Sequence, residues 1–102
     1  MSVDDAKNLI VSYVSQHIPA LGSLGAEVRT ASLDEVVITA PLSKNHNDKG
    51  TAFAGSQYLL AIAACWSLAY LNARAEGVEN PDLIGAEGSI KHLKPARADE
   101  II

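Results

Sequence analysis

The segment from Tyr58 to Leu71 constrains the fold of this chain most, because every position in it except Ser67 is apolar. A helix that is apolar on all sides is normally buried on all sides. The run is too short to span a bilayer and has a length typical of a buried core helix. We therefore expect one central helix surrounded by the rest of the protein.

A polar loop with two asparagines, Asn45 and Asn47, precedes this helix and is followed by small residues. Thr51 is the expected N-cap, and Gly55 lies in the expected first turn. Gly77 is the expected C′ residue, after a helix that ends near Ala75. The N-terminus of such a helix presents unpaired N–H groups and a partial positive charge, which suits a developing negative charge on a substrate.

The length and composition allow one small domain, since the chain has 102 residues, of which 48% are hydrophobic. The net charge of −4 gives no reason to expect a nucleic-acid partner. A single cysteine, Cys65, excludes an internal disulfide and a cysteine-based metal site, and we expect it to be a core residue. We expect neither a cofactor nor a membrane partner. The N-terminus lacks a secretory pattern, so the expected compartment is the cytoplasm.

The N-terminal residues 2 to 18 have the pattern of an amphipathic helix. Ser2 and Asp5 resemble a capping box, and Pro19 with Gly22 is expected to close the helix. The residues on one stripe, spaced as a buried helix face requires, are Ala6, Leu9, Ile10, Tyr13, Val14 and His17.

Alternating apolar residues predict strands elsewhere in the chain. The first two are expected at residues 26–32 and 35–42, where β-branched residues are frequent. A long strand is expected at 83–93, and another begins at Glu100. This order predicts an α+β domain with an antiparallel sheet around the central helix. Three short strands cannot enclose a helix, so further sheet is expected from additional C-terminal residues, from a partner subunit, or from both.

The loop and helix start resemble the hotdog fold, and in particular the PaaI-like acyl-CoA thioesterases. The residues that keep the spacing of that motif are Asn47, Gly50, Phe53, Ala54 and Gly55. A bacterial group of thioesterase-like domains, sometimes fused behind a GNAT-type acetyltransferase, is more similar still. The features shared with that group are Asn45, Asn47, the run from Gly50 to Ser56, Trp66 and the strand from Ile90 to Pro95.

This resemblance implies a single hotdog domain over residues 1–102, with the hotdog core beginning near residue 24. It also implies a domain that is incomplete at its C-terminus, and a homodimer or higher homo-oligomer whose active site lies at the interface. The activity implied is hydrolysis of a thioester of CoA or acyl carrier protein, in fatty acid metabolism.

By this resemblance, the N–H groups of Ala54 and Gly55 form an oxyanion hole for the thioester carbonyl. Asn47 orients a water molecule or holds the carbonyl, with Asn45 beside it. The alternative is that both asparagines cap backbone groups of the loop. Asn45, Phe53, Ser56 and Tyr58 are expected to bind the substrate, with Tyr58 in the wall of the acyl pocket. Lys91, Lys94 and Arg97 are expected to meet phosphates, or else to be ordinary solvated charges.

One departure from the family pattern puts the water-activating base in doubt. Many PaaI-like enzymes carry a carboxylate two turns into the central helix, and the matching residue here is Ile62. Asp48, the nearest acid and the candidate catalytic residue, or Glu87 could replace it, and the alternative for each is an acid that faces solvent. Decarboxylation of a malonyl thioester needs no such base, so it is the alternative reaction. A third possibility is a non-catalytic module for acyl-thioester binding or dimerisation.

Overall fold

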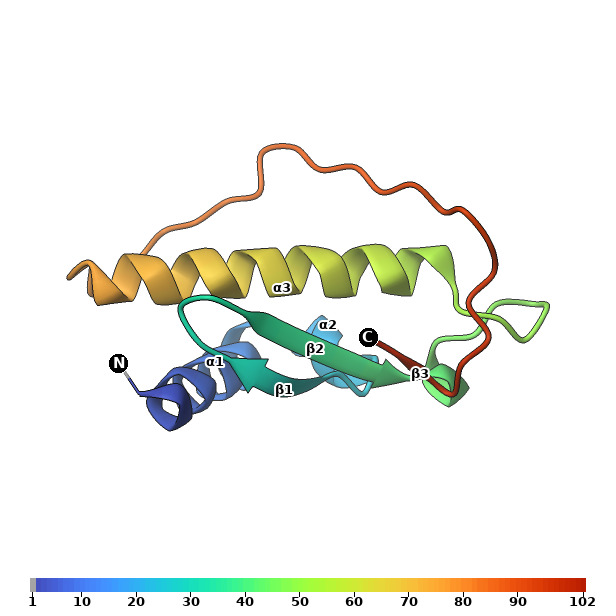
Figure 1. Ribbon diagram of the computed structural model, residues 1–102, viewed down its shortest axis with the longest axis horizontal. Helices are drawn as coiled ribbons and strands as arrows, with labels where there is room; N and C mark the ends of the chain where they lie inside the picture. Colours follow the sequence, from blue (N-terminus) through green and yellow to red (C-terminus); the bar gives the residue numbers. More distant parts are fainter. Residues whose placement is uncertain (1) are drawn as a thin grey trace.

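The computed structural model describes residues 2–102 as an α+β domain in which a short antiparallel sheet packs on one long helix (Figure 1). The predicted fold class is confirmed. The elements in chain order are α1 (Val3–His17), α2 (Pro19–Ser23), β1 (Glu27–Ala31), β2 (Val36–Pro41), the 3-10 turn η1 (Leu42–Lys44), α3 (Ala54–Ala75) and β3 (Glu100–Ile101).

Helix α1 forms as its sequence pattern predicts. The Ser2 hydroxyl accepts a hydrogen bond from the Asp5 N–H at 3.1 Å, which satisfies one of the free donors of the first turn. Ala6 and Ile10 are buried, whereas His17 is exposed and lies against the Tyr13 ring. As expected, α1 ends before Pro19, at His17, and Pro19 then opens the separate short helix α2, because a proline fits the first helical position.

The sheet has the order β1-β2-β3, and both pairings are antiparallel. The first two strands lie within a residue of the predicted bounds at each end, with a register irregularity between Val28 and Thr30. The predicted strand start at Glu100 is also confirmed, since Ile101 pairs with Ala40. Ala40 and Pro41, at the end of β2, therefore pair with β3, close to the loop that leads into α3.

Helix α3 packs one face on this sheet and ends where it was predicted to end. Its buried residues are Ser56, Leu60, Ala63, Ser67, Tyr70 and Leu71. Gly77 has a positive φ of 97°, which a glycine adopts without strain, and its N–H closes the last turn by bonding to the Arg74 carbonyl. The predicted N-cap was wrong. Phe53 takes that position without a side-chain hydrogen bond.

The opposite face of α3 is exposed, so the expectation that the helix is buried on all sides was wrong. Ala61, Ile62, Cys65 and Ala69 lie on this outer face, and Cys65 is not a core residue. The reason is that the sheet of the described residues covers a single side of the helix (Figure 1).

Helix α3 is longer than the apolar run from Tyr58 to Leu71, which alone is too short to span a bilayer. With 22 residues it is long and apolar enough to cross a bilayer, judged by length and composition alone. Core helices of soluble proteins meet the same criteria. The inner face of α3 packs on the sheet, which is the arrangement of a core helix.

The expected strand at 83–93 is not formed, although the chain there is drawn out along the outer face of α3 (Figure 1). A strand requires a neighbour with free hydrogen-bonding groups, and within residues 2–102 the sheet pairs elsewhere. Leu83 packs against the core, whereas Ile84 is 84% exposed.

Candidate functional site

Asn47 organises the loop that leads into α3. Its amide oxygen accepts hydrogen bonds from the N–H groups of Lys49 at 2.9 Å and Thr51 at 3.1 Å. Its amide nitrogen donates to the Thr51 hydroxyl at 2.8 Å. An amide nitrogen has two N–H groups, and within residues 2–102 only one of those of Asn47 has a partner, which leaves the other for a ligand. Thr51, expected as an N-cap, is buried and serves this loop instead.

Asn45 is a buried junction between three parts of the fold. It is 2% exposed, and its amide nitrogen donates to the carbonyls of Leu24 at 2.9 Å and Pro41 at 2.8 Å. Its own backbone carbonyl accepts from the Phe53 N–H at 2.7 Å. Both amide donors of Asn45 are therefore committed to the protein. Within residues 2–102, the side-chain hydrogen bonds of Asn45 go to backbone carbonyls, as expected for a residue that caps backbone groups.

The N-terminus of α3 is open to solvent. Ala54 and Gly55 are exposed, and no side chain of the described residues caps this end. The Phe53 ring lies directly against Gly55, and a methyl group added at Gly55 would come within 2.5 Å of the ring. Ser56, one residue further, is buried. The first free N–H groups of a long helix thus face solvent beside an aromatic ring, with the positive end of the helix dipole behind them.

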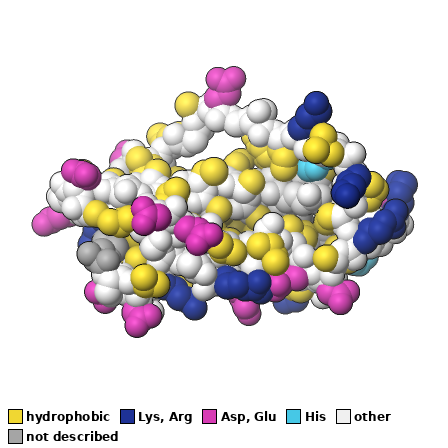
Figure 2. Space-filling model, viewed as in Figure 1, with side chains coloured by type: hydrophobic (Ala, Val, Ile, Leu, Met, Phe, Trp, Pro, Cys, Tyr) yellow, Lys and Arg dark blue, Asp and Glu magenta, His cyan; other side chains and the backbone are white. Residues whose placement is uncertain are grey.

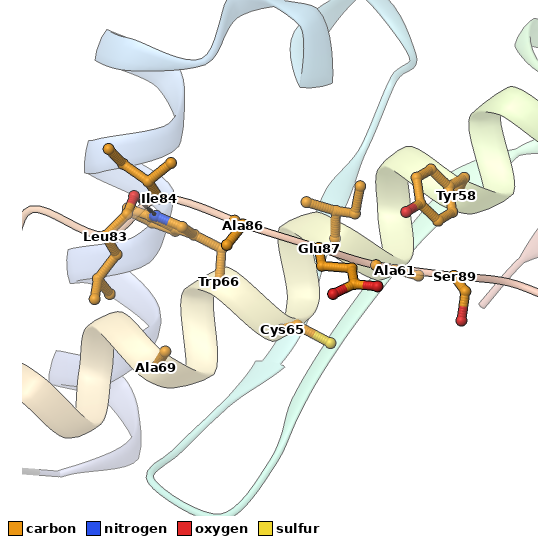
Figure 3. A pocket seen from close by; sticks show the side chains of 13 residues that line it. Tyr58, Ala61, Cys65, Trp66, Ala69, Leu83, Ile84, Ala86, Glu87 and Ser89 are labelled. Carbon is orange, nitrogen blue, oxygen red and sulfur yellow. Dashed lines mark hydrogen bonds between the residues drawn. The ribbon is translucent and has the colours of Figure 1, made fainter.

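Asp48 and Glu87 are the two acidic candidates for the water-activating base. Asp48 faces solvent, and Glu87 lies beside the outer face of α3. The Asp48 side chain is 83% exposed and pairs with Lys49 at 3.3 Å, as a solvated loop acid does. Helix α3 contains no aspartate or glutamate, and Ile62 is 42% exposed on its outer face. Glu87 lies beside the outer face of α3, on the segment that passes over it (Figure 3). Residues 2–102 bring together no group of three His, Cys, Asp or Glu side chains that could hold a metal ion.

Two backbone contacts bring the basic C-terminal segment to the same end of α3. The Ala52 N–H donates to the Ala96 carbonyl at 2.9 Å, and the Leu42 N–H donates to the Asp99 carbonyl at 2.7 Å. Lys94 and Arg97 flank Ala96, and they are exposed, as is Lys91. Lys and Arg side chains gather at this end of the molecule in Figure 2, at the right of the view.

A cavity of about 660 Å³ lies between the outer face of α3 and residues 83–89 (Figure 3). The Trp66 indole N–H donates to the Leu83 carbonyl at 3.1 Å, which fixes one end of the covering segment. Near the other end, a methyl group added at Gly88 would meet the Tyr58 hydroxyl at 2.7 Å. The residues that line the cavity are Tyr58, Ala61, Ile62, Cys65, Trp66, Ala69 and 83–89.

Sequence reasoning found one wall of this cavity, Tyr58, and missed the rest. The outer face of α3 was expected to be covered by sheet, so no space was expected beside it. A signal was nevertheless present, because Ala61, Cys65 and Ala69 are small residues spaced by one helical turn along one face.

The solved structures that are similar to this chain include the following two. A protein of unknown function from Chlorobaculum tepidum TLS is 32% identical with a TM-score of 0.90, and the match covers 97% of this chain and 60% of that one. A structure described as a "putative thioesterase" from Shewanella oneidensis is 26% identical with a TM-score of 0.83, covering 92% of this chain and 65% of that one. This chain therefore spans less than two thirds of the length of either structure.

The family comparison covers most of the chain, including the loop, the N-terminus of α3 and the segment over its outer face. Residues 7–102 match the family described as "Putative thioesterase (yiiD_Cterm)". The chain accordingly belongs to this thioesterase family, and its domain has the hotdog fold.

Proposed function

We propose that this domain hydrolyses acyl thioesters of CoA or of acyl carrier protein. The observation that carries the proposal is the open N-terminus of α3, where Ala54 and Gly55 are exposed and uncapped by any described side chain. The family description and the name of the Shewanella structure support the same reaction class.

In the proposed reaction, the thioester carbonyl oxygen accepts hydrogen bonds from the N–H groups of Ala54 and Gly55. Water attacks the carbonyl carbon, and the resulting oxyanion is stabilised by these fixed donors and by the helix dipole. Collapse of the intermediate breaks the carbon–sulfur bond, and the thiolate leaves and takes up a proton. The free N–H of Asn47 orients the attacking water or the carbonyl, while Phe53 and Ser56 contact the substrate.

A second candidate reaction, decarboxylation of a malonyl thioester, is favoured by the missing base. Helix α3 offers no carboxylate, and Asp48 is exposed and paired with Lys49. In decarboxylation, the bond to the carboxylate carbon breaks, carbon dioxide leaves, and the electron pair forms an enolate, which takes up a proton from water at carbon to give the acetyl thioester. The same two N–H donors stabilise the enolate oxygen, and no water-activating base is required. A non-catalytic binding or dimerisation module is the remaining alternative.

We also propose that the domain acts as a homodimer in the cytoplasm, and that its partner is the CoA or carrier-protein part of the thioester. The exposed apolar face of α3 and the unpaired segment 83–93 are surfaces that a second copy could cover. Lys91, Lys94 and Arg97 supply cations for the phosphates of either carrier.

The Ala54→Pro variant tests the oxyanion site without disturbing the helix. Ala54 is the first helical residue, where proline is favoured, and proline has no N–H to donate. Phe53 has a φ of −67° and a ψ of 131°, an extended conformation that a residue before proline adopts readily. We expect the turnover rate to fall by a factor on the order of 10²–10³ with the fold retained.

The assay uses saturated acyl thioesters and malonyl thioesters and separates free thiol from carbon dioxide by mass spectrometry. Val3→Pro is the matched control, because Val3 is the first residue of α1, away from the site, and follows an extended Ser2. Free thiol from the saturated substrates, lost in Ala54→Pro alone, supports the thioesterase. Carbon dioxide without free thiol supports the decarboxylase. Full activity in Ala54→Pro would rule out this oxyanion site, and no product from the wild type would favour a binding module.

A further inference from the structure

We propose that His46 is the general base that activates water for thioester hydrolysis. This inference rests on the proposed function, because it supplies the proton acceptor that the reaction needs. Helix α3 contains no carboxylate, and the Asp48 side chain is 83% exposed and paired with Lys49. His46 lies in the same loop, between the two asparagines that shape the approach to α3.

The backbone places His46 opposite Ala52, two residues before α3 begins at Ala54. The two residues form an isolated antiparallel bridge. Hydrogen bonds flank this bridge on both sides, from the Phe53 N–H to the Asn45 carbonyl at 2.7 Å and from the Asn47 N–H to the Thr51 carbonyl at 2.8 Å. A pair between two such bonds is a non-hydrogen-bonded pair, whose Cα atoms are about 4.5 Å apart and whose side chains share a face. His46 is therefore anchored beside the residues that lead into the proposed oxyanion site.

The hydrogen bonding of the His46 ring leaves one nitrogen able to accept a proton. The Nδ1 atom lies 3.0 Å from the Asn47 backbone carbonyl. A carbonyl oxygen only accepts, so Nδ1 carries the hydrogen of the neutral ring and Nε2 carries the lone pair. His46 is exposed, and Nε2 has no hydrogen-bond partner among residues 2–102. A neutral imidazole with one nitrogen held as a donor and the other open to water has the form of a general base.

In the proposed step, Nε2 of His46 takes a proton from water while the water oxygen bonds to the thioester carbonyl carbon. The carbonyl oxygen becomes an oxyanion at the N–H groups of Ala54 and Gly55. When the carbon–sulfur bond breaks, the leaving thiolate takes the proton from Nε2, which regenerates the neutral ring. The Asn47 carbonyl can hold the ring through both transfers, since Nδ1 is a donor in the neutral and in the charged form.

The charged side chains around His46 come from its own loop and from the segment that returns to it, and the first turn of α3 adds none. They are Lys44, Asp48, Lys49, Lys94, Arg97 and Asp99. All six are exposed, so high salt screens their effect on the ring. A pH profile recorded in high salt therefore reports mainly on His46 itself.

His46→Gln tests the base, because glutamine keeps a polar side chain but takes up no proton near neutral pH. We would measure free thiol released from an acyl thioester of pantetheine, a substrate without phosphate groups that titrate in the same range. In the wild type, kcat/KM should fall as the pH decreases between about pH 8 and pH 5, because a histidine base becomes protonated. In His46→Gln, kcat/KM at neutral pH should be lower by a factor on the order of 10²–10⁴, and this pH dependence should disappear.

His17→Gln is the matched control, because it is the same substitution at an exposed histidine at the end of α1. It should keep the rate and the pH dependence of the wild type. A wild-type rate in His46→Gln would overturn the proposal. A lower rate with the pH dependence retained would also overturn it, because His46 would then support the loop rather than accept the proton.

The base and the proposed function can fail separately. Full activity in His46→Gln together with lost activity in Ala54→Pro would keep the oxyanion site and reject the base. Lost activity and lost pH dependence in His46→Gln together with full activity in Ala54→Pro would keep the base and reject the oxyanion site. Carbon dioxide without free thiol from the wild type would reject hydrolysis and the base together, since decarboxylation requires none.

Discussion

Asn45 and Asn47 carry the same side chain two positions apart, yet the fold uses them differently. Asn47 holds its own loop together, and one of its amide N–H groups has no partner among residues 2–102. Asn45 is buried and ties the carbonyls of Leu24 and Pro41 to the residue that precedes α3. The hydrogen bonds of Asn45 therefore fix the residue before α3, whereas Asn47 is the residue proposed to contact the substrate.

At this scale we predict that Asn45→Ala lowers the free energy of unfolding by about 1–3 kcal/mol. Removal of the amide leaves two carbonyls without their donor, and a buried unsatisfied polar group costs about this amount. Urea denaturation of the variant and the wild type measures the difference.

Asn8→Ala provides the control for this measurement, since Asn8 is exposed on α1 and alanine is the better helix former. It should be neutral or slightly stabilising. A loss in Asn45→Ala no larger than in the control would show that the two hydrogen bonds contribute little.

At the scale of elements, α3 has two faces with different tasks. Its inner face joins two buried clusters, one with α1 and β1 and one with α2 and β2. Its outer face carries small apolar residues beneath the extended segment 83–93. The inner face thus fixes the N-terminus of α3 over the end of β2, and the outer face remains available for a ligand or a second copy.

The segment 83–93 gives a prediction of its own. Its amides have no strand partner within residues 2–102, so they should exchange rapidly with deuterium in dilute protein, while those of β2 and the inner face of α3 exchange slowly. Mass spectrometry of exchange at increasing protein concentration makes the measurement.

Protection of 83–93 that increases with concentration would support pairing with a second copy. Residues 36–39 are the internal reference, since they pair with β1 within one copy of the chain and their protection should not depend on concentration. Equally fast exchange of 83–93 at all concentrations would count against a dimer built through this segment.

At the scale of the whole molecule, charge is distributed unevenly despite the net value of −4. Lys91, Lys94 and Arg97 lie on the segment that returns to the start of α3, and Lys44 and Lys49 flank the loop there. In Figure 2, acidic side chains are spread over the rest of the view, together with some Lys and Arg side chains along its lower edge. An anionic carrier would thus be attracted to the end at which the thioester is proposed to react.

We predict that the double variant Lys94→Glu/Arg97→Glu raises KM for a CoA thioester and leaves kcat nearly unchanged. Exposed charges each contribute up to about 1 kcal/mol, so an increase of roughly three- to tenfold is expected. The effect should shrink in high salt, because exposed charges are screened.

Lys7→Glu is the control for this experiment, since Lys7 is exposed on α1, far from the loop. Steady-state kinetics at low and high ionic strength measure the changes. An equal change in the control would mean that net charge, rather than the basic end, governs binding.

The spacing of apolar residues and the residues typical of turns were enough to predict α1, β1, β2, the start of β3 at Glu100 and the end of α3. These features depend on contacts between near neighbours, such as Ser2 with Asp5, or on a residue with its own backbone preference, such as Gly77. The motif residues from Asn47 to Gly55 likewise pointed to the end of α3 that is open.

Only the tertiary structure decided where α3 begins, which of its faces is covered and what path 83–93 takes. Thr51 has the chemistry of an N-cap, but its groups bond to Asn47, so the helix starts after Phe53. The run Tyr58 to Leu71 is apolar on all sides, yet burial requires a second layer, which the sheet supplies on one side. Segment 83–93 alternates as a strand does, but a strand exists only where another chain segment offers its hydrogen bonds.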